Sequence, residues 1–90
     1  MKKAVKVEIF GTVQGIFFRQ FIYDNAENLG IKGYVRNKPD GSIEAWLEGD
    51  EDNVKKMIEV CKKGPQHAVI KRVDVVDGNF QGLKEFKILK

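Results

Sequence analysis

The sequence predicts an α+β fold in which a single sheet is covered on one face by two helices. Apolar residues alternate with polar ones in several short segments, and two longer segments repeat apolar residues at helical spacing. These segments follow one another in the order βαββαβ, with a short additional strand at the end. We expect a single domain over residues 1–90, because a chain of this size is too small to divide its hydrophobic core.

The first predicted strand and the first predicted helix are separated by a loop with a glycine at each end. Residues 4–10 alternate, with Val5, Val7 and Ile9 on the buried face. Residues 11–15 break this pattern, and apolar side chains return at helical spacing over residues 18–29. Gly30 then supplies a left-handed stop, so we expect the helix to end at Leu29.

The second and third predicted strands form a hairpin. Residues 31–37 have an extended pattern, and residues 39–41 (PDG) have the chemistry of a turn. Residues 42–48 alternate again, with inward-facing positions at Ile43, Ala45 and Leu47.

The second helix and the last two strands complete the pattern. Asp50 is expected to cap a helix that ends at residues 62–65 (KKGP). Its apolar stripe consists of Val54, Met57, Ile58 and Cys61. A fourth strand is marked by Val69, Val73 and Val75, and a short final strand, after a loop at 77–82, by Phe86 and Ile88. This order matches the split βαβ arrangement of the ferredoxin-like sandwich, with a mixed sheet and both helices on one face.

The composition excludes several classes of protein. No apolar run is long enough to span a membrane, and the charges of Lys6 and Glu8 interrupt the apolar core that a signal peptide needs, so we expect a cytoplasmic protein without a membrane partner. Cys61 and His67 are the only residues of their types, which excludes an internal disulfide and a zinc cluster built from Cys and His. Asp40 is expected to serve the turn rather than a magnesium ion. A net charge of +3 is too small to imply nucleic acid.

The predicted topology brings two polar residues to one edge of the sheet. A right-handed crossover makes the first and second strands parallel, so the loop at 11–18 and the end of the second strand share an edge. Backbone amides of that loop and the start of the helix could hold an anion, and Arg19 could add a two-point contact. Asn37 lies at the same edge. The alternative is that Gly11 and Gly15 only shape a tight connection, Arg19 is solvated and Asn37 is a turn residue.

Two stretches resemble the signatures of the acylphosphatase family. Residues 11–19 (GTVQGIFFR) are similar to its first signature, and residues 33–44 (GYVRNKPDGSIE) to its second. The resemblance continues through residues 48–49, 64–65 and 86–88 and so covers nearly the whole chain. Ile16 replaces the usual valine and Tyr34 a common tryptophan, and neither change removes a needed donor or acceptor.

The resemblance implies a ferredoxin-like fold and hydrolysis of small acyl phosphates to a carboxylate and inorganic phosphate. It implies that Arg19 binds the phosphoryl group and that Asn37 positions the attacking water. The backbone that would hold the phosphoryl oxygens consists of Gly15, Ile16, Phe17, Phe18 and Arg19. No metal or other cofactor is expected, and we expect a monomer that acts alone, although similar domains are also fused within hydrogenase-maturation proteins.

A rival hypothesis is an RNA-binding module. Phe10 and Trp46 are expected on the open face of the two central strands, where RNA-recognition modules with the same element order stack bases. Against this, the glycine-aromatic consensus of those modules belongs on the third strand, whereas residues 32–34 (KGY) lie on the second. A catalytically silent binding or regulatory module of the same fold is a further alternative.

Overall fold

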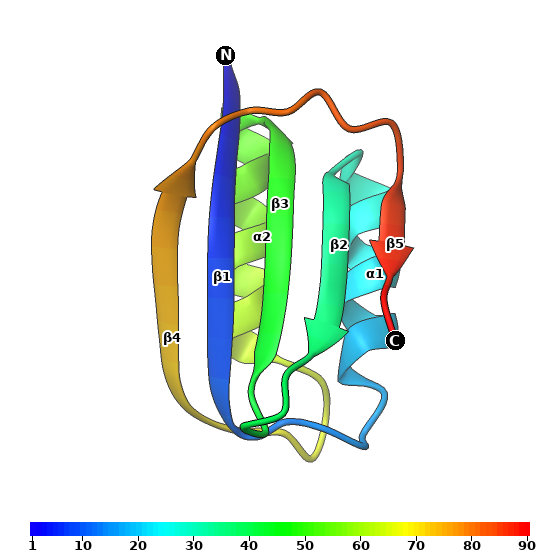
Figure 1. The fold of residues 1–90 in the computed structure, drawn as a ribbon, viewed down its shortest axis with the longest axis vertical. Coiled ribbons are helices and arrows are strands. Elements are labelled where there is room, and N and C mark those ends of the chain that lie inside the picture. Colours follow the sequence, from blue (N-terminus) through cyan, green and yellow to red (C-terminus); the bar gives the residue numbers. More distant parts are fainter.

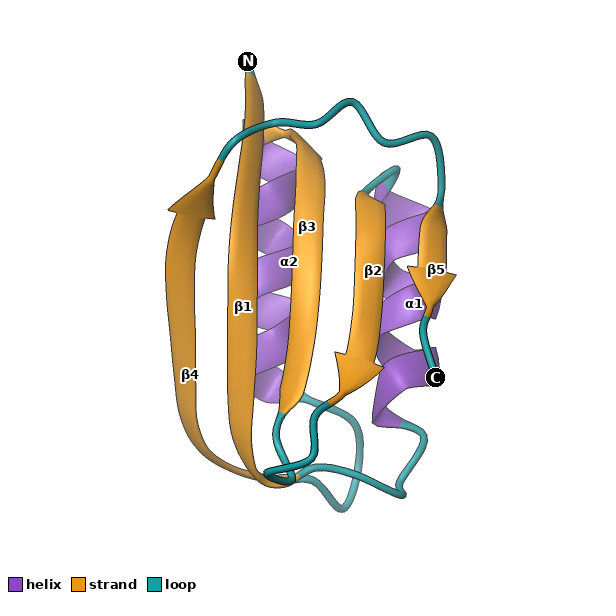
Figure 2. Ribbon diagram, in the orientation of Figure 1, coloured by secondary structure: helices purple, strands orange, loops and turns teal.

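Five strands form one mixed sheet, and both helices pack on one of its faces (Figure 1). The computed structural model describes all of residues 1–90. The predicted α+β class, the element order and the ferredoxin-like arrangement are confirmed, and Figure 2 shows the two helices together behind the strands. The elements are β1 (Lys2–Thr12), α1 (Phe18–Leu29), β2 (Lys32–Asn37), β3 (Ile43–Asp50), α2 (Glu51–Lys63), β4 (Val69–Gly78) and β5 (Phe86–Ile88).

The strands differ from the predicted ranges at their ends. β1 runs from Lys2 to Thr12 rather than over residues 4–10, because it lies between two partners and its pairing continues beyond the apolar alternation. In the same way β3 continues to Asp50, which pairs with Lys2, and β4 continues to Gly78, which pairs with Ala4. Backbone pairing, which has no side-chain signal, fixes these ends.

The strand order places the start of α1 and the end of β2 at the same edge of the sheet. The order is β4-β1-β3-β2-β5, with β3 antiparallel to both β1 and β2. β1 and β2 are therefore parallel, as predicted, and their carboxyl ends meet at the lower edge of the sheet in Figure 1. The loop after β1 and the hairpin between β2 and β3 both lie at this edge, which is where the polar residues were expected.

The core lies between the sheet and the helices. The predicted inward residues of β1 (Val5, Val7 and Ile9) and of β3 (Ile43, Ala45 and Leu47) are fully buried. Against them pack Phe18, Ile22 and Ala26 of α1 and Val54, Met57 and Cys61 of α2, while Ile58 is only partly buried. This apolar layer fixes α1 on the sheet and so fixes the position of its first turn.

The two helices end as predicted but begin differently from each other. Gly30 has φ 67° and donates its N–H to carbonyls of the last turn of α1, which confirms the left-handed stop. Asp50 occupies the N-cap position of α2, but its side chain makes no capping hydrogen bond, so that expectation was wrong. The carboxylate instead pairs with Lys2, 3.3 Å away on the neighbouring strand. Neither helix is long and apolar enough to cross a membrane.

Candidate functional site

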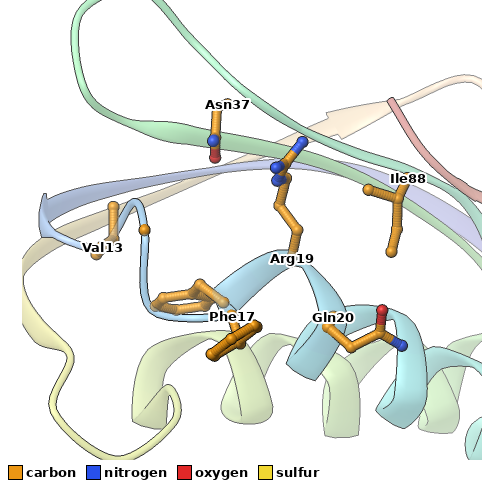
Figure 3. A pocket seen from close by; sticks show the side chains of 8 residues that line it. Val13, Phe17, Arg19, Gln20, Asn37 and Ile88 are labelled. Atoms are coloured by element: carbon orange, nitrogen blue, oxygen red, sulfur yellow. The ribbon is translucent and has the colours of Figure 1, made fainter. Parts of the chain in front are cut away.

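A cavity of about 320 Å³ opens at the shared edge of β1 and β2, beside the start of α1. Arg19 and Asn37, which the sequence predicted to meet, both line it (Figure 3). The cavity is large enough for a small ligand, since sites for small molecules begin at about 300 Å³. Its walls come from the loop after β1, the first turn of α1, the end of β2 and β5, and consist of Val13, Gly15, Phe17, Phe18, Arg19, Gln20, Asn37 and Ile88.

The loop between β1 and α1 contains two residues in the left-handed region of backbone space. Gly15 has φ 78°, and Phe17, which occupies the N-cap position of α1, has φ 61° and ψ 25°. A bulky residue rarely adopts this conformation, which costs on the order of 1–3 kcal/mol and persists only where the surroundings enforce it. The loop is therefore held in one particular shape at the cavity.

That shape leaves the first amides of α1 free. None of the backbone N–H groups of residues 17–20 donates a hydrogen bond to another group of the chain, and the first bond of the helix runs from Phe21 N–H to Phe17 O at 3.0 Å. The first turn of α1 contains no acidic residue, whereas α2 begins with Glu51 and Asp52. The positive end of the α1 dipole is thus not neutralised by the chain, and it can attract an anion in the cavity.

Arg19 extends from the first turn of α1 toward the end of β2 (Figure 3). Its Nη1 donates a hydrogen bond to the carbonyl of Leu89 at 2.9 Å. The acceptor is itself held in place, because the N–H of Leu89 donates to the carbonyl of Val35 on β2 at 2.8 Å. A guanidinium has five N–H donors, so this contact orients Arg19 and leaves further donors for an anion.

Asn37 is the last residue of β2 and faces the same cavity. Its side chain points from the strand toward the loop and α1 (Figure 3). The amide oxygen is buried and accepts no hydrogen bond from the chain. A buried acceptor without a partner costs about 1–3 kcal/mol, so this oxygen is set up to accept a hydrogen bond from a molecule in the cavity.

Gln14 joins the two halves of the site through a contact that was not predicted from the residue pattern. Its Nε2 donates to the carbonyls of Lys38 and Ser42, both at 2.9 Å. These carbonyls belong to the hairpin that begins at Asn37, so one amide ties the loop after β1 to the end of β2. A glutamine between glycines in a predicted anion loop is the only signal that could have identified it, and that signal does not specify its acceptors.

Arg36, the neighbour of Asn37, points to the opposite face of the sheet. Side chains alternate along a strand, so Arg36 and Tyr34 lie on the face without helices. Arg36 forms an ion pair with Glu44 at 2.9 Å, and the hydroxyl of Tyr34 donates to the other oxygen of Glu44 at 2.5 Å. Burial and the hydrogen bond to Glu44 raise the pKa of Tyr34 to about 12. Arg36 is therefore engaged outside the cavity.

The remaining candidate ligands lie in turns. Asp40 accepts hydrogen bonds from the hydroxyl and the N–H of Ser42 at 2.6 and 2.9 Å, and these bonds lower the pKa of its carboxyl group. This is the turn chemistry that the sequence predicted. His67 is exposed in the connection before β4. No three His, Cys, Asp or Glu side chains are grouped so that they could hold a metal ion.

The two aromatic residues of the open face already have neighbours within the chain. The guanidinium of Arg72 lies 4.3 Å from the ring centroid of Phe10. The ring of Trp46 packs so closely on Gly78 that an added Cβ there would lie 2.3 Å from it, and its Nε1 donates to Glu48 at 3.3 Å. These contacts disfavour the use of the two rings as a platform for stacking bases.

Comparison with known proteins identifies the family of the chain. The family model described as Acylphosphatase matches residues 5–88. An acylphosphatase of Nocardioides sp. is 43% identical over 98% of this chain and 89% of its own length. The crystal structure of an acylphosphatase from Bacillus subtilis superimposes with a TM-score of 0.94 at 27% identity, over all of both chains. A crystal structure of full-length HypF in a phosphate- and nucleotide-bound form aligns with a TM-score of 0.93 at 31% identity, but only over 12% of that chain. The chain belongs to the acylphosphatase family.

Proposed function

We propose that the cavity hydrolyses small acyl phosphates by direct attack of a water molecule on phosphorus. One observation carries the proposal: the free amides of the first turn of α1, the guanidinium of Arg19 and the unpartnered amide oxygen of Asn37 all border one cavity. The first two features suit an anion, and the third suits a neutral hydrogen-bond donor such as water.

The phosphoryl group is held by fixed positive charge. The backbone of residues 15–19 surrounds its oxygens with N–H groups, and Arg19 contributes charge-assisted hydrogen bonds. These donors are in place before the substrate arrives, because the left-handed residues Gly15 and Phe17 fix the loop and Leu89 fixes the arginine. Donors that need no reorganisation stabilise the charge of the transition state most effectively.

Asn37 positions the water. A water that donates one hydrogen to the Asn37 oxygen directs a lone pair toward phosphorus. Attack forms the new P–O bond as the bond from phosphorus to the acyl oxygen breaks, and the carboxylate leaves with the bonding electron pair. The proton lost by the water passes to a phosphoryl oxygen, so that an acyl phosphate dianion and water give a carboxylate and dihydrogen phosphate.

So few groups suffice because the leaving group is good. A carboxylate is a weak base and departs without a strong general acid. What the protein must supply is orientation and charge stabilisation, which are the main requirements of phosphoryl transfer. The proposal includes no metal and no other cofactor. It also holds that residues 1–90 act as a single domain and as a monomer, in the cytoplasm, without a nucleic-acid or membrane partner.

The test is release of phosphate from benzoyl phosphate in the presence of a chelator. Arg19→Ala should lower kcat/KM by roughly 100- to 1000-fold, since loss of one charge-stabilising donor costs about 2.7–4 kcal/mol. Asn37→Ala should lower kcat while inhibition by inorganic phosphate is largely retained, because the water and not the phosphate is lost. Arg72→Ala and Asn79→Ala, which remove the same residue types outside the cavity, serve as matched controls.

Four results would contradict the proposal. Loss of activity with the chelator would refute the metal-free mechanism, and full activity of Arg19→Ala would refute the assignment of the phosphate site. A rate that followed the titration of a protein group at the cavity would show that the substrate phosphate does not accept the proton. A salt-dependent complex with single-stranded RNA, without phosphatase activity, would support the rival hypothesis instead.

A further inference from the structure

Phe17 presents a large apolar ring to solvent at the cavity. Phe17 is 86% exposed, whereas Phe80, the next most exposed aromatic residue, is 48% exposed. Single exposed apolar residues are common on protein surfaces. Phe17 differs from such residues because it also lines the cavity and has φ 61°, so that a left-handed backbone holds the ring outside the core. Its neighbour Phe18, by contrast, is buried in the core.

The position of Phe17 relative to Asn37 indicates what the ring meets. Figure 3 shows the two residues on opposite sides of the cavity, with Asn37 on the β2 side and Phe17 on the α1 side. In phosphoryl transfer the attacking and leaving oxygens lie roughly in line, on opposite sides of phosphorus. If the water lies beside Asn37, the acyl group departs toward Phe17.

We infer that Phe17 is a specificity residue that binds the acyl group of the substrate and favours acyl phosphates whose acyl group is aromatic or otherwise apolar. This inference rests on the proposed function, because it uses the positions assigned there to phosphate and water. The aromatic ring of a benzoyl group packs against the ring of Phe17, whereas an acetyl group offers only one methyl group to it. Because Phe17 both lines the cavity and is exposed, an acyl group that leaves the phosphate site on this side meets the face of its ring.

The contact is measured best as a ratio between two substrates. Truncation of Phe17 can also alter the loop, but an effect on the phosphate site acts on both substrates and cancels in the ratio. For the wild type, Phe17→Ala, Phe17→Tyr and Phe80→Ala, kcat/KM is determined with benzoyl phosphate and with acetyl phosphate. The ratio should fall about fivefold in Phe17→Ala, as expected for loss of one aromatic contact. It should be kept in Phe17→Tyr and in the control Phe80→Ala.

If Phe17→Ala no longer hydrolyses either substrate, the preference for the acyl group can still be measured by the binding of analogues that are not hydrolysed. Phenacylphosphonate and acetonylphosphonate replace the bridging oxygen of the two substrates by a methylene group and cannot be hydrolysed at that position. Calorimetry should show tighter binding of the phenacyl compound by the wild type and a loss of most of that preference in Phe17→Ala. A wild-type protein that hydrolyses neither acyl phosphate, yet keeps a Phe17-dependent preference between the phosphonates, would refute the proposed function alone. A ratio that stays within twofold of the wild type in Phe17→Ala, in turnover and in binding, would overturn the inference while leaving the proposed function intact.

Discussion

The guanidinium of Arg19 is anchored by the backbone carbonyl of Leu89, which lies 70 residues later in the sequence and 2.9 Å from its Nη1. The carbonyl belongs to the segment that follows β5, and the N–H of Leu89 holds this segment on β2 through Val35. The orientation of the arginine thus depends on three elements at once: α1 carries it, β5 leads to its acceptor and β2 supports that acceptor. A short hydrogen bond from a charged donor contributes about 1.5–3 kcal/mol.

Removal of Leu89 should therefore weaken the phosphate site without unfolding the protein. We expect a chain that ends at Ile88 to show a roughly tenfold weaker inhibition by inorganic phosphate, because Arg19 loses the acceptor that orients it. The control is Lys90→Ala, which changes the end of the chain but keeps the peptide carbonyl of Leu89. The inhibition constant is measured from hydrolysis of benzoyl phosphate, with a thermal melt of each chain. Equal inhibition of all three chains would show that Arg19 is oriented by other contacts.

Gln14 should matter for stability as well as for activity. Gln14→Glu replaces an amide that donates to the carbonyls of Lys38 and Ser42 by a carboxylate of the same shape that can only accept. We expect the free energy of unfolding to fall by about 1–3 kcal/mol, since two carbonyls lose their donor and face a negative charge. The hydrolytic activity of the folded variant should also fall, because the hairpin that carries Asn37 is released from the loop.

The control for this variant is Gln66→Glu, which introduces the same charge at an exposed position before β4. Urea denaturation of both variants and of the wild type gives the comparison. If Gln14→Glu and Gln66→Glu are equally stable, the two hydrogen bonds of Gln14 do not hold the hairpin.

The sequence was most informative where side chains alone determine the structure. The alternation in β1 and β3 and the apolar stripes of both helices predicted the buried residues, because burial selects side-chain type directly. The parallel direction of β1 and β2 followed from the handedness of the crossover, and with it the meeting of Arg19 and Asn37 at one edge. The cavity that both residues line could therefore be anticipated before its shape was known.

The features that the sequence did not predict depend on the backbone or on exact distances. Leu89 contributes a carbonyl that any residue would supply, so its side chain carries no trace of the contact with Arg19. Asp50 has a side chain typical of a helix cap, but Lys2 competes for it from a strand 48 residues earlier in the chain. The buried, unpartnered oxygen of Asn37 follows from the packing around it and not from its residue type.

Substitution by alanine should have very different effects at Gly15 and at Gly33. An added Cβ at Gly15 would contact nothing within 4 Å, so Gly15→Ala meets only the cost of φ 78° in a residue with a side chain. We expect a loss of about 1–2 kcal/mol of stability and weaker binding of phosphate, since the loop that presents the amides relaxes. Gly15→Asn should be less affected, because asparagine tolerates the left-handed region better.

Gly33→Ala provides the contrast. Gly33 lies in β2 with φ 144°, and an added Cβ would lie 1.7 Å from the carbonyl oxygen of Trp46 on β3. The two strands would have to separate, so we expect this variant not to fold, as judged by near-ultraviolet circular dichroism and a thermal melt. A folded Gly33→Ala protein, or an unfolded Gly15→Ala protein, would contradict this assignment of steric cost to Gly33 and conformational cost to Gly15.

The network of Tyr34, Arg36 and Glu44 on the open face of the sheet should make stability depend on pH at its alkaline end. The pKa of Tyr34 is raised to about 12, above the ordinary value of 10.0, by burial and by its hydrogen bond to Glu44. Between these two values the unfolded chain loses the phenolic proton and the folded chain keeps it, so the unfolded state is favoured progressively as the pH rises. The stabilisation that Tyr34 contributes is therefore complete below pH 10 and is lost as the pH approaches 12.

Tyr34→Phe has no phenolic proton, so its free energy of unfolding should decrease less than that of the wild type between pH 9 and about pH 11.5. At pH 9 the variant should be less stable than the wild type, because Glu44 loses a donor. Urea denaturation at the two pH values, with Tyr23→Phe as a second tyrosine variant, isolates the effect from the general titration of lysines. An equal decrease in the wild type and in Tyr34→Phe would show that the Tyr34 hydroxyl titrates alike in the folded and unfolded states.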